Sequence, residues 1–391
     1  MASPFDDVRE EELRRRRTVK WTLHGPAVLA AWVAETDFSL APPVRAALLE
    51  AVERSELGYA PADTTELTSA CADFLVESYG WSVPPARIFL VADVLSGITG
   101  ALEAFVPAGA GVVLPTPAYP PFFDIVELTG RPVVEVPLVD DAGRPALDLE
   151  AIGTALSGGA RAVLLCNPQN PTGRVFTLAE LRELAQVVER HGARVVADEV
   201  HAPLVYPGAR FVPYATVSEA AATHTVTVTS ASKAWNIPAL KCAQVIASNH
   251  ADAAAWRALP LHRVPDATAL GIVASTAAYL HGRPWLGALV EYLDGNRHLL
   301  GELLAEEAPA IGYRRPEGTY LAWLDCARLD VADPAGFFLR EARVALNDGP
   351  SFGQGWGRHV RLNFGTSRRM LERIVAAMGS ALRARSGPSH R

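Results

Sequence analysis

The sequence predicts an α/β protein with a central sheet covered by helices on both faces and a smaller α/β portion at the C-terminal end. Between about residues 40 and 250, short apolar runs alternate with helical segments, as in open sheets built from β-α-β units. After residue 250, long helical segments dominate, and two further apolar runs and a closing helix follow. We therefore expect an N-terminal arm (1–40) that joins the small domain, a large domain (41–285) and a small C-terminal domain (286–391).

The expected elements follow one another in a regular order. Strands are predicted at 87–93, 110–117, 131–139, 161–168 and 193–200, at two places within 225–249, and later at 318–326 and 359–366. Helices are predicted at 42–55, 97–106, 120–130, 148–158, 177–192, 268–282, 285–308 and 368–385. The helix at 177–192 has the clearest end signals, because Thr177 precedes Glu180 by three residues and Gly192 closes the segment.

Composition narrows the function classes. The net charge of −7 and the pI near 5.8 argue against a dedicated nucleic-acid surface, so a small-molecule partner is expected. The four cysteines stand singly, which favours neither a disulfide framework nor a metal site and fits a reducing compartment. The N-terminus lacks the apolar segment of a secretory signal, and no apolar run reaches about 18 residues. We expect a cytoplasmic protein without a membrane span.

Polar residues gather where three of the predicted strands end. Asn170 lies in the turn NPQNPTG, Asp198 ends the run ARVVAD, and Lys233 stands in the turn SASK after TVTVT. The carboxyl ends of strands in open α/β sheets form ligand-binding crevices. A lysine with a depressed pKa forms a Schiff base with an aldehyde cofactor, and an aspartate keeps a pyridine nitrogen protonated. The set predicts pyridoxal phosphate chemistry, with desolvation and nearby cations such as Lys241 lowering the pKa of Lys233.

Several motifs, in this order along the chain, resemble one family. NPQNPTG, ADEVH, SASKAWNIPALK and VRLNFG are similar to motifs of the fold type I pyridoxal-phosphate enzymes in the class I/II aminotransferase superfamily. The stretches WVAETDFSLAPPV, LGYAPAD, PTPAYPPF and GTYLAWLD resemble its cystathionine β-lyase branch of C–S lyases. The resemblance covers about residues 20 to 385. It implies the aspartate aminotransferase-like fold, with a mostly parallel seven-stranded sheet sandwiched by helices.

The resemblance also implies roles around the cofactor ring. Lys233 would carry the Schiff base and remove the substrate Cα proton, Asp198 would pair with the pyridinium, and Asn170 would donate to the 3′-oxygen. Tyr119 matches the aromatic residue that stacks on the ring. His201 stands where many aminotransferases have a tyrosine that reaches the same oxygen, and a purely structural histidine is the alternative.

For the cofactor phosphate, the resemblance implies a loop and a helix N-terminus. The backbone N–H groups of Val94, Leu95 and Ser96 would face the phosphate, and Ser230 and Lys241 match its hydroxyl and cationic contacts. Local structural roles for the three backbone donors are the alternative.

The remaining contacts concern the subunit partner and the substrate. Tyr59 matches a tyrosine that reaches the phosphate from the neighbouring subunit, so a homodimer with shared active sites is implied. Arg361 matches the arginine that clamps the substrate α-carboxylate with its planar fork. Tyr320 either lines the substrate pocket or packs within its strand. Thr36, near the expected substrate entrance, replaces a common methionine, and residues 347–348 replace the usual Pro-Gly, which weakens an assignment to cystathionine itself.

The same residues serve several reactions. If a thiolate leaves Cβ after the Cα proton is removed, the enzyme is a C–S β-lyase; if the proton returns to the cofactor, it is an aminotransferase. Decarboxylation or oxidative deamination of a cysteine conjugate is a third possibility. A regulatory binding protein on the same fold is the non-enzyme alternative, against which the retention of Lys233, Asp198, Asn170 and Arg361 argues.

Overall fold

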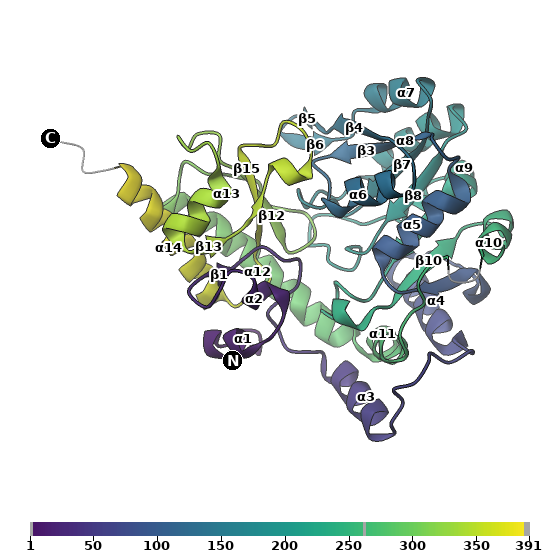
Figure 1. Cartoon of the computed structure of the whole chain (residues 1–391), viewed down its shortest axis with the longest axis horizontal. Coiled ribbons are helices and arrows are strands. Elements are labelled where there is room, and N and C mark those ends of the chain that lie inside the picture. Colours follow the sequence, from purple (N-terminus) through teal and green to yellow (C-terminus); the bar gives the residue numbers. More distant parts are fainter. Residues whose placement is uncertain (1–2, 261–262, 387–391) are drawn as a thin grey trace.

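The computed structural model describes residues 3–260 and 263–386, and its larger sheet lies at the centre of the upper right part of Figure 1. Five neighbouring strands of this sheet are parallel, and β10 is antiparallel to both of its neighbours. The architecture confirms the predicted α/β class with a mostly parallel seven-stranded sheet. Across the sheet the strands are β2 (Ile88–Val91), β10 (Ala243–Ala247), β9 (Thr225–Thr229), β8 (Arg194–Asp198), β7 (Ala160–Cys166), β3 (Gly111–Thr116) and β4 (Val133–Pro137).

Helices cover both faces of this sheet because its strands are apolar on both sides. On β3, Val112 packs with α5 (Val94–Phe105), α6 (Pro121–Leu128) and α10 (His250–Arg257). The next residue, Val113, points to the other face and packs with α7 (Leu149–Ser157), α8 (Leu178–Arg190) and α9 (Glu219–His224). This alternation follows from the two-residue period of a strand.

The end signals of α8 are confirmed. The Thr177 hydroxyl accepts the N–H of Glu180, the Glu180 carboxylate accepts the N–H of Thr177, and Gly192 has a φ of 58° just beyond the helix. A reciprocal pair of this kind satisfies two backbone donors that a helix start leaves free.

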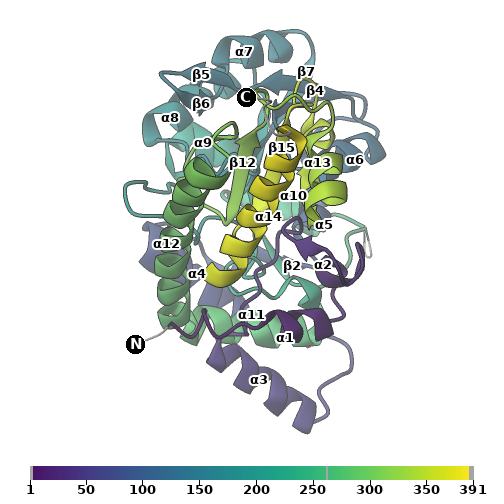
Figure 2. The same ribbon diagram turned by 90° about the vertical axis from the view of Figure 1, so that its left-hand side faces the viewer.

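A smaller sheet lies on the left of Figure 1 in the order β11 (Gly312–Tyr313), β12 (Leu321–Asp325), β15 (His359–Asn363) and β14 (Asn347–Asp348). The long helix α12 (Arg283–Glu307) packs against α14 (Arg368–Ser386), and Figure 2 shows the two helices beside this sheet. A second helical group, α3 (Pro42–Glu53), α4 (Thr65–Tyr79) and α11 (Ala269–His281), lies below the large sheet. Among the helices of the described residues, none is both long and apolar enough to span a bilayer.

The N-terminal segment contacts the smaller sheet region. Its strand β1 (Leu29–Ala30) pairs in parallel with β13 (Val344–Ala345). The division at residues 40 and 285 stays a prediction. Further short elements include α1 (Glu10–Arg15), α2 (Val19–Thr22), the hairpin of β5 (Val139–Asp141) and β6 (Arg144–Ala146), α13 (Pro334–Phe337) and a π-helical turn, Phe338–Ala342.

A buried ion pair holds the N-terminal segment in place. Lys20 Nζ lies 2.9 Å from Asp37 Oδ1, and both side chains are only 1% exposed. The same carboxylate oxygen accepts the indole N–H of Trp21 at 3.0 Å. The pair fixes the chain three residues after Ala34, whose carbonyl oxygen contacts Lys233.

Candidate active site

A cavity of about 180 Å³ opens at the carboxyl ends of β7, β8 and β9. Open α/β sheets bind ligands at this edge. Nine of the side chains or backbone segments expected from the sequence line the cavity: Val94, Leu95, Tyr119, Asn170, Asp198, His201, Ser230, Lys233 and Lys241. Five expected residues are not among its lining: Thr36, Tyr59, Ser96, Tyr320 and Arg361.

Lys233 is enclosed by protein. Its Nζ donates to the carbonyl oxygen of Ala34 at 2.9 Å. Burial and, second, the positive charge of Arg361 lower the pKa of Lys233 to about 8, although the negative charges of Asp198 and Glu35 act in the opposite direction. An amine with this pKa is partly neutral near pH 7 and can react as a nucleophile. The cation that acts on it is therefore Arg361, and the expectation that Lys241 has this effect was wrong.

Asp198 is a buried acid whose negative charge is only partly compensated by its neighbours. Its Oδ1 accepts the backbone N–H of Val200 at 3.0 Å, and its Oδ2 lies 3.9 Å from the thiol of Cys166. Burial raises the pKa of Asp198 to about 6, although the Val200 N–H and the charge of Lys233 act in the opposite direction. A cationic N–H placed at Oδ2 would relieve this penalty.

His201 also lines the cavity. Burial, followed by the charges of Lys233 and Arg361, holds the pKa of His201 well below its usual range, so the ring is neutral. Its Nδ1 is buried and has no hydrogen-bond partner among the described residues. Its ring centroid lies 5.9 Å from that of Tyr320. The free ring nitrogen makes His201 available to a ligand.

Arg361 is held between the two sheets. Its Nη1 donates to Asn170 Oδ1 at 2.9 Å, and its Nη2 donates to Asn347 Oδ1 at 2.6 Å and to the Trp32 carbonyl at 2.9 Å. The guanidinium carbon lies 5.1 Å from the ring centroid of Phe352. Burial lowers the pKa of Arg361 to about 10, and within the described residues its Nε has no partner. A buried, oriented guanidinium with a free donor fits an anionic substrate group.

The start of α5 differs in part from the expected phosphate site. Asp93 caps the helix, because its Oδ1 accepts the backbone N–H and the hydroxyl of Ser96, both at 2.8 Å. The Ser96 N–H is therefore already paired, whereas Val94 and Leu95 line the cavity. Lys241 Nζ lies 2.8 Å from Asp93 Oδ2, and its side chain is half-exposed. The sequence reasoning missed Asp93, although an Asp three residues before a Ser at a helix start is a capping signal.

Ser230 and Tyr119 complete the lining. The Ser230 hydroxyl donates to the Cys242 carbonyl at 2.7 Å and accepts the N–H of Ser232 at 3.0 Å. The ring of Tyr119 packs edge to face on Phe122 with centroids 5.5 Å apart. Both residues line the cavity, and their contacts with a cofactor stay predictions.

Besides Ser96 and Arg361, three expected residues lie outside the cavity lining. Tyr59 is fully exposed between α3 and α4. Tyr320 is fully buried and donates its hydroxyl to the Ala34 carbonyl, which agrees with the packing alternative. Thr36 is buried, and its backbone N–H and carbonyl pair with the side-chain amide of Asn236, both at 2.9 Å.

Comparisons with known proteins agree with this geometry. The family model described as "Aminotransferase class I and II" matches residues 33–378. A cystathionine beta-lyase of Corynebacterium glutamicum is 40% identical, with 95% of this chain and 98% of the relative covered. A "putative plp-dependent beta-cystathionase" of Corynebacterium diphtheriae has a TM-score of 0.91 at 41% identity, with 95% and 97% of the two chains covered. The PLP-bound C-S lyase of Staphylococcus hominis has a TM-score of 0.89 at 26% identity, with 97% and 98% covered. The chain belongs to the class I and II aminotransferase family.

Proposed function

We propose that this protein is a pyridoxal-phosphate-dependent C–S β-lyase that converts cystathionine or another S-substituted L-cysteine to a thiol, pyruvate and ammonia. The site residues serve an aminotransferase equally well. The observation that carries the choice of a lyase is the similarity, over nearly the whole chain, to the cystathionine beta-lyase of Corynebacterium glutamicum. The C-S lyase of Staphylococcus hominis supports the same choice.

The residues present fit pyridoxal phosphate. Asp198 is a buried carboxylate whose Oδ2 has no cationic partner in the part of the chain that the structure describes, which suits a protonated ring nitrogen. The amine of Lys233 suits an aldehyde, and Lys241 with the first turn of α5 suits a phosphate. When bound, pyridoxal phosphate supplies an electron sink for the charge that proton removal leaves on the substrate Cα.

The chain's own residues then have defined tasks. Arg361 binds the substrate α-carboxylate and orients the Cα–H bond toward Lys233. Lys233, as the neutral amine, takes the Cα proton, and its ammonium form can deliver a proton to the sulfur that leaves Cβ. Asn170 holds Arg361 in position through the 2.9 Å contact between their side chains. Hydrolysis of the remaining enamine yields pyruvate and ammonia.

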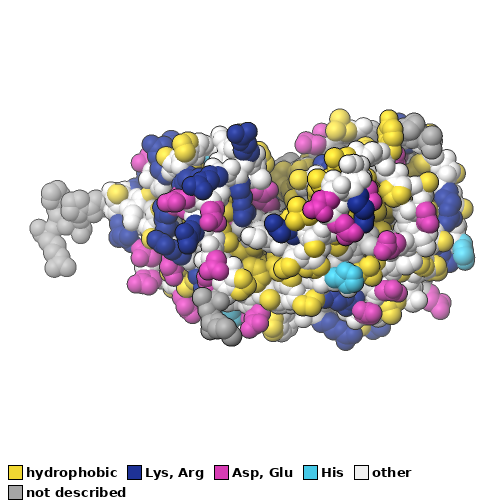
Figure 3. All heavy atoms as spheres, turned by 90° about the horizontal axis from the view of Figure 1, so that it is seen from below, with side chains coloured by type: hydrophobic (Ala, Val, Ile, Leu, Met, Phe, Trp, Pro, Cys, Tyr) yellow, Lys and Arg dark blue, Asp and Glu magenta, His cyan; other side chains and the backbone are white. Residues whose placement is uncertain are grey.

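We further propose a homodimer with shared sites, in which Tyr59 reaches the partner's phosphate. Figure 3 views the molecule from the side on which α3 projects in Figure 1, and hydrophobic side chains gather in the middle of that face. Leu49, Val52 and Leu57 are each about half-exposed near Tyr59, which is fully exposed. Exposed apolar residues that lie close together in the sequence, on a molecule with a hydrophobic face, favour an interface there. A cytoplasmic location stays a prediction, and the four free, buried cysteines are compatible with it.

The decisive experiment measures products without a keto acid. S-alkyl cysteines should yield thiol and pyruvate in equal amounts, whereas dependence on an added keto acid would favour an aminotransferase. The chain has only three lysines, Lys20, Lys233 and Lys241, so the attachment site is easily mapped by borohydride reduction. Lys233→Ala should lose both the reducible link and turnover, and Lys241→Arg should keep the link. Retained turnover in Lys233→Ala would contradict the assignment.

A further inference from the structure

Residues 32–37 form a segment that lies against both the lysine turn and the smaller sheet, and we call it the 32–37 segment. Asn363 Nδ2 on β15 donates to the carbonyls of Val33 and Glu35 at 2.5 and 2.7 Å. Asn236, three residues after Lys233, clamps Thr36 through two hydrogen bonds of 2.9 Å. These bonds fix the segment from two sides without involving Ala34.

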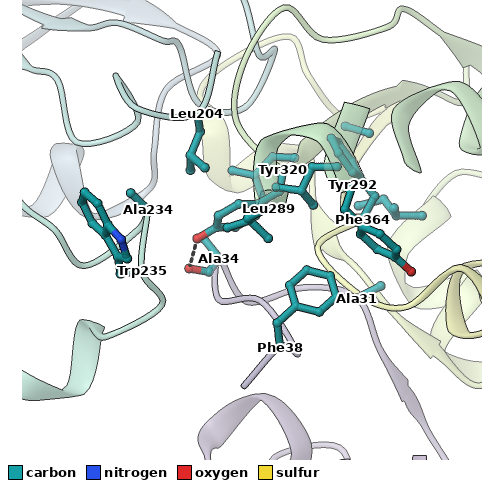
Figure 4. Packing of buried hydrophobic residues seen from close by; sticks show 14 of the residues in the cluster. Ala31, Ala34, Phe38, Leu204, Ala234, Trp235, Leu289, Tyr292, Tyr320 and Phe364 are labelled. Carbon is teal, nitrogen blue, oxygen red and sulfur yellow. Dashed lines mark hydrogen bonds between the residues drawn. The ribbon is translucent and has the colours of Figure 1, made fainter. Parts of the chain in front are cut away.

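The carbonyl oxygen of Ala34 accepts two hydrogen bonds. Lys233 Nζ donates to it at 2.9 Å, and the hydroxyl of Tyr320 donates to it at 2.9 Å. Figure 4 shows the Tyr320 ring directed at Ala34, with the hydrogen bond dashed. Tyr320 is fully buried, so water does not compete at its hydroxyl. One backbone oxygen therefore serves both the lysine and a neutral donor.

We propose that Tyr320 is a positioning residue for Lys233: by donating to the Ala34 carbonyl oxygen, it limits how strongly that oxygen holds the lysine ammonium. Two donors on one oxygen each withdraw electron density, so removal of one strengthens the bond to the other. Because Asn363 and Asn236 hold the segment independently, the Ala34 carbonyl stays in place when the Tyr320 hydroxyl is removed. Of the two donors found among residues 3–260 and 263–386, only Lys233 then remains.

The consequence is a change in the proton affinity of Lys233. A hydrogen bond made by the charged form of a group favours that form, so a stronger bond to Ala34 raises the pKa of the lysine. The other groups that face Lys233 are Arg361 on β15, Asp198 at the end of β8, Glu35 in the 32–37 segment, and neutral His201. None of them bonds to the Tyr320 hydroxyl, so replacing Tyr320 with phenylalanine leaves them unchanged.

The test is the pH dependence of pyridoxal phosphate attachment to the full-length, cofactor-free chain, followed by absorbance. The attachment rate follows the neutral fraction of Lys233. The midpoint is the pH at which the attachment rate is half of its maximum. In Tyr320→Phe, this midpoint should rise by about half a pH unit, which makes attachment about threefold slower at pH 7. Tyr206→Phe is the matched control, because Tyr206 is also fully buried and donates to a backbone carbonyl, that of Thr319. Its midpoint should equal that of the wild type.

A second variant tests the direction independently and avoids loss of side-chain volume. Insertion of 3-fluorotyrosine at position 320 makes the hydroxyl a stronger donor, so the midpoint should fall. An unchanged or lower midpoint in folded Tyr320→Phe, or an unchanged or higher one with 3-fluorotyrosine, would overturn the proposal. The inference rests on the proposed function only through attachment at Lys233. If the wild-type chain does not attach pyridoxal phosphate there, the proposed function fails; if it does and Tyr320 has no effect, only the inference fails.

Discussion

Replacing Asp198 with asparagine should stabilise the cofactor-free chain above pH 6, although it removes the proposed partner of the cofactor ring. Asp198 is 5% exposed, and burial raises its pKa from 3.8 to about 6. Asparagine keeps an oxygen that can accept the N–H of Val200, which bonds Asp198 at 3.0 Å. The substitution thus removes the charge and little else.

The direction follows from proton binding. An acid with a higher pKa in the folded chain than in the unfolded chain binds more protons when folded, so the free energy of unfolding falls as pH rises. For Asp198 this window lies between about pH 4 and pH 6. Each unit of pKa difference is worth about 1.4 kcal/mol, so the full effect is about 3 kcal/mol, of which about 2 kcal/mol falls between pH 4 and pH 7. The asparagine variant does not lose this free energy of unfolding as pH rises, because its side chain does not ionise.

Urea unfolding of both cofactor-free chains from pH 4 to pH 7 measures the effect. The stability of Asp198→Asn relative to wild type should increase by about 2 kcal/mol over this range. Glu199→Gln is an informative control, because burial raises the pKa of the adjacent Glu199 to about 8. Its stability relative to wild type should therefore rise with pH from about pH 4.5 up to about pH 8. A relative stability that is flat, or that favours the wild type as pH rises, would refute the reasoning.

Two further substitutions test binding and folding. Arg361→Lys keeps the charge but loses the planar fork, so kcat/KM for an S-substituted cysteine should fall about 10- to 100-fold. The variant should also distinguish this substrate less well from the corresponding amine without the carboxylate. An unchanged preference for the substrate over that amine would contradict the assigned role. Lys20→Met leaves the Asp37 carboxylate buried without its cation, so urea unfolding should show a loss of about 3 to 5 kcal/mol. Arg54→Met, at the exposed pair with Glu50, should lose much less, because solvent screens that pair, and equal losses in the two variants would contradict the stabilising role of the buried pair.

The sequence allowed the catalytic candidates to be placed because each follows a strand. Asn170, Asp198 and Lys233 come after β7, at the end of β8 and after β9, and these three strands are neighbours in the sheet. Parallel neighbours present their carboxyl ends at one edge, so residues far apart in sequence meet there. The common lining of one cavity by these three residues was therefore predictable from strand positions alone.

Other parts of the site left no signal in the sequence. Ala34 contacts Lys233 through its backbone carbonyl, which every residue possesses, so its side chain gives no indication of the contact. The lowering of the Lys233 pKa by Arg361 depends on how the two sheets pack, which local patterns do not specify. Asp93 pairs with Lys241 across 148 residues of sequence. Only the folded chain shows that the N-terminus of α5 and the Lys241 ammonium share the Asp93 carboxylate.

The scarcity of lysine has a practical consequence for handling this protein. Lys20 is buried in an ion pair, Lys233 is enclosed, and Lys241 is half-exposed at the rim of the cavity. Amine-reactive dyes, cross-linkers and coupling resins therefore have one accessible lysine to modify, and it adjoins the active-site candidate. We expect molecules that are coupled through Lys241 to face the support with the cavity, so an immobilisation that avoids this side chain is preferable.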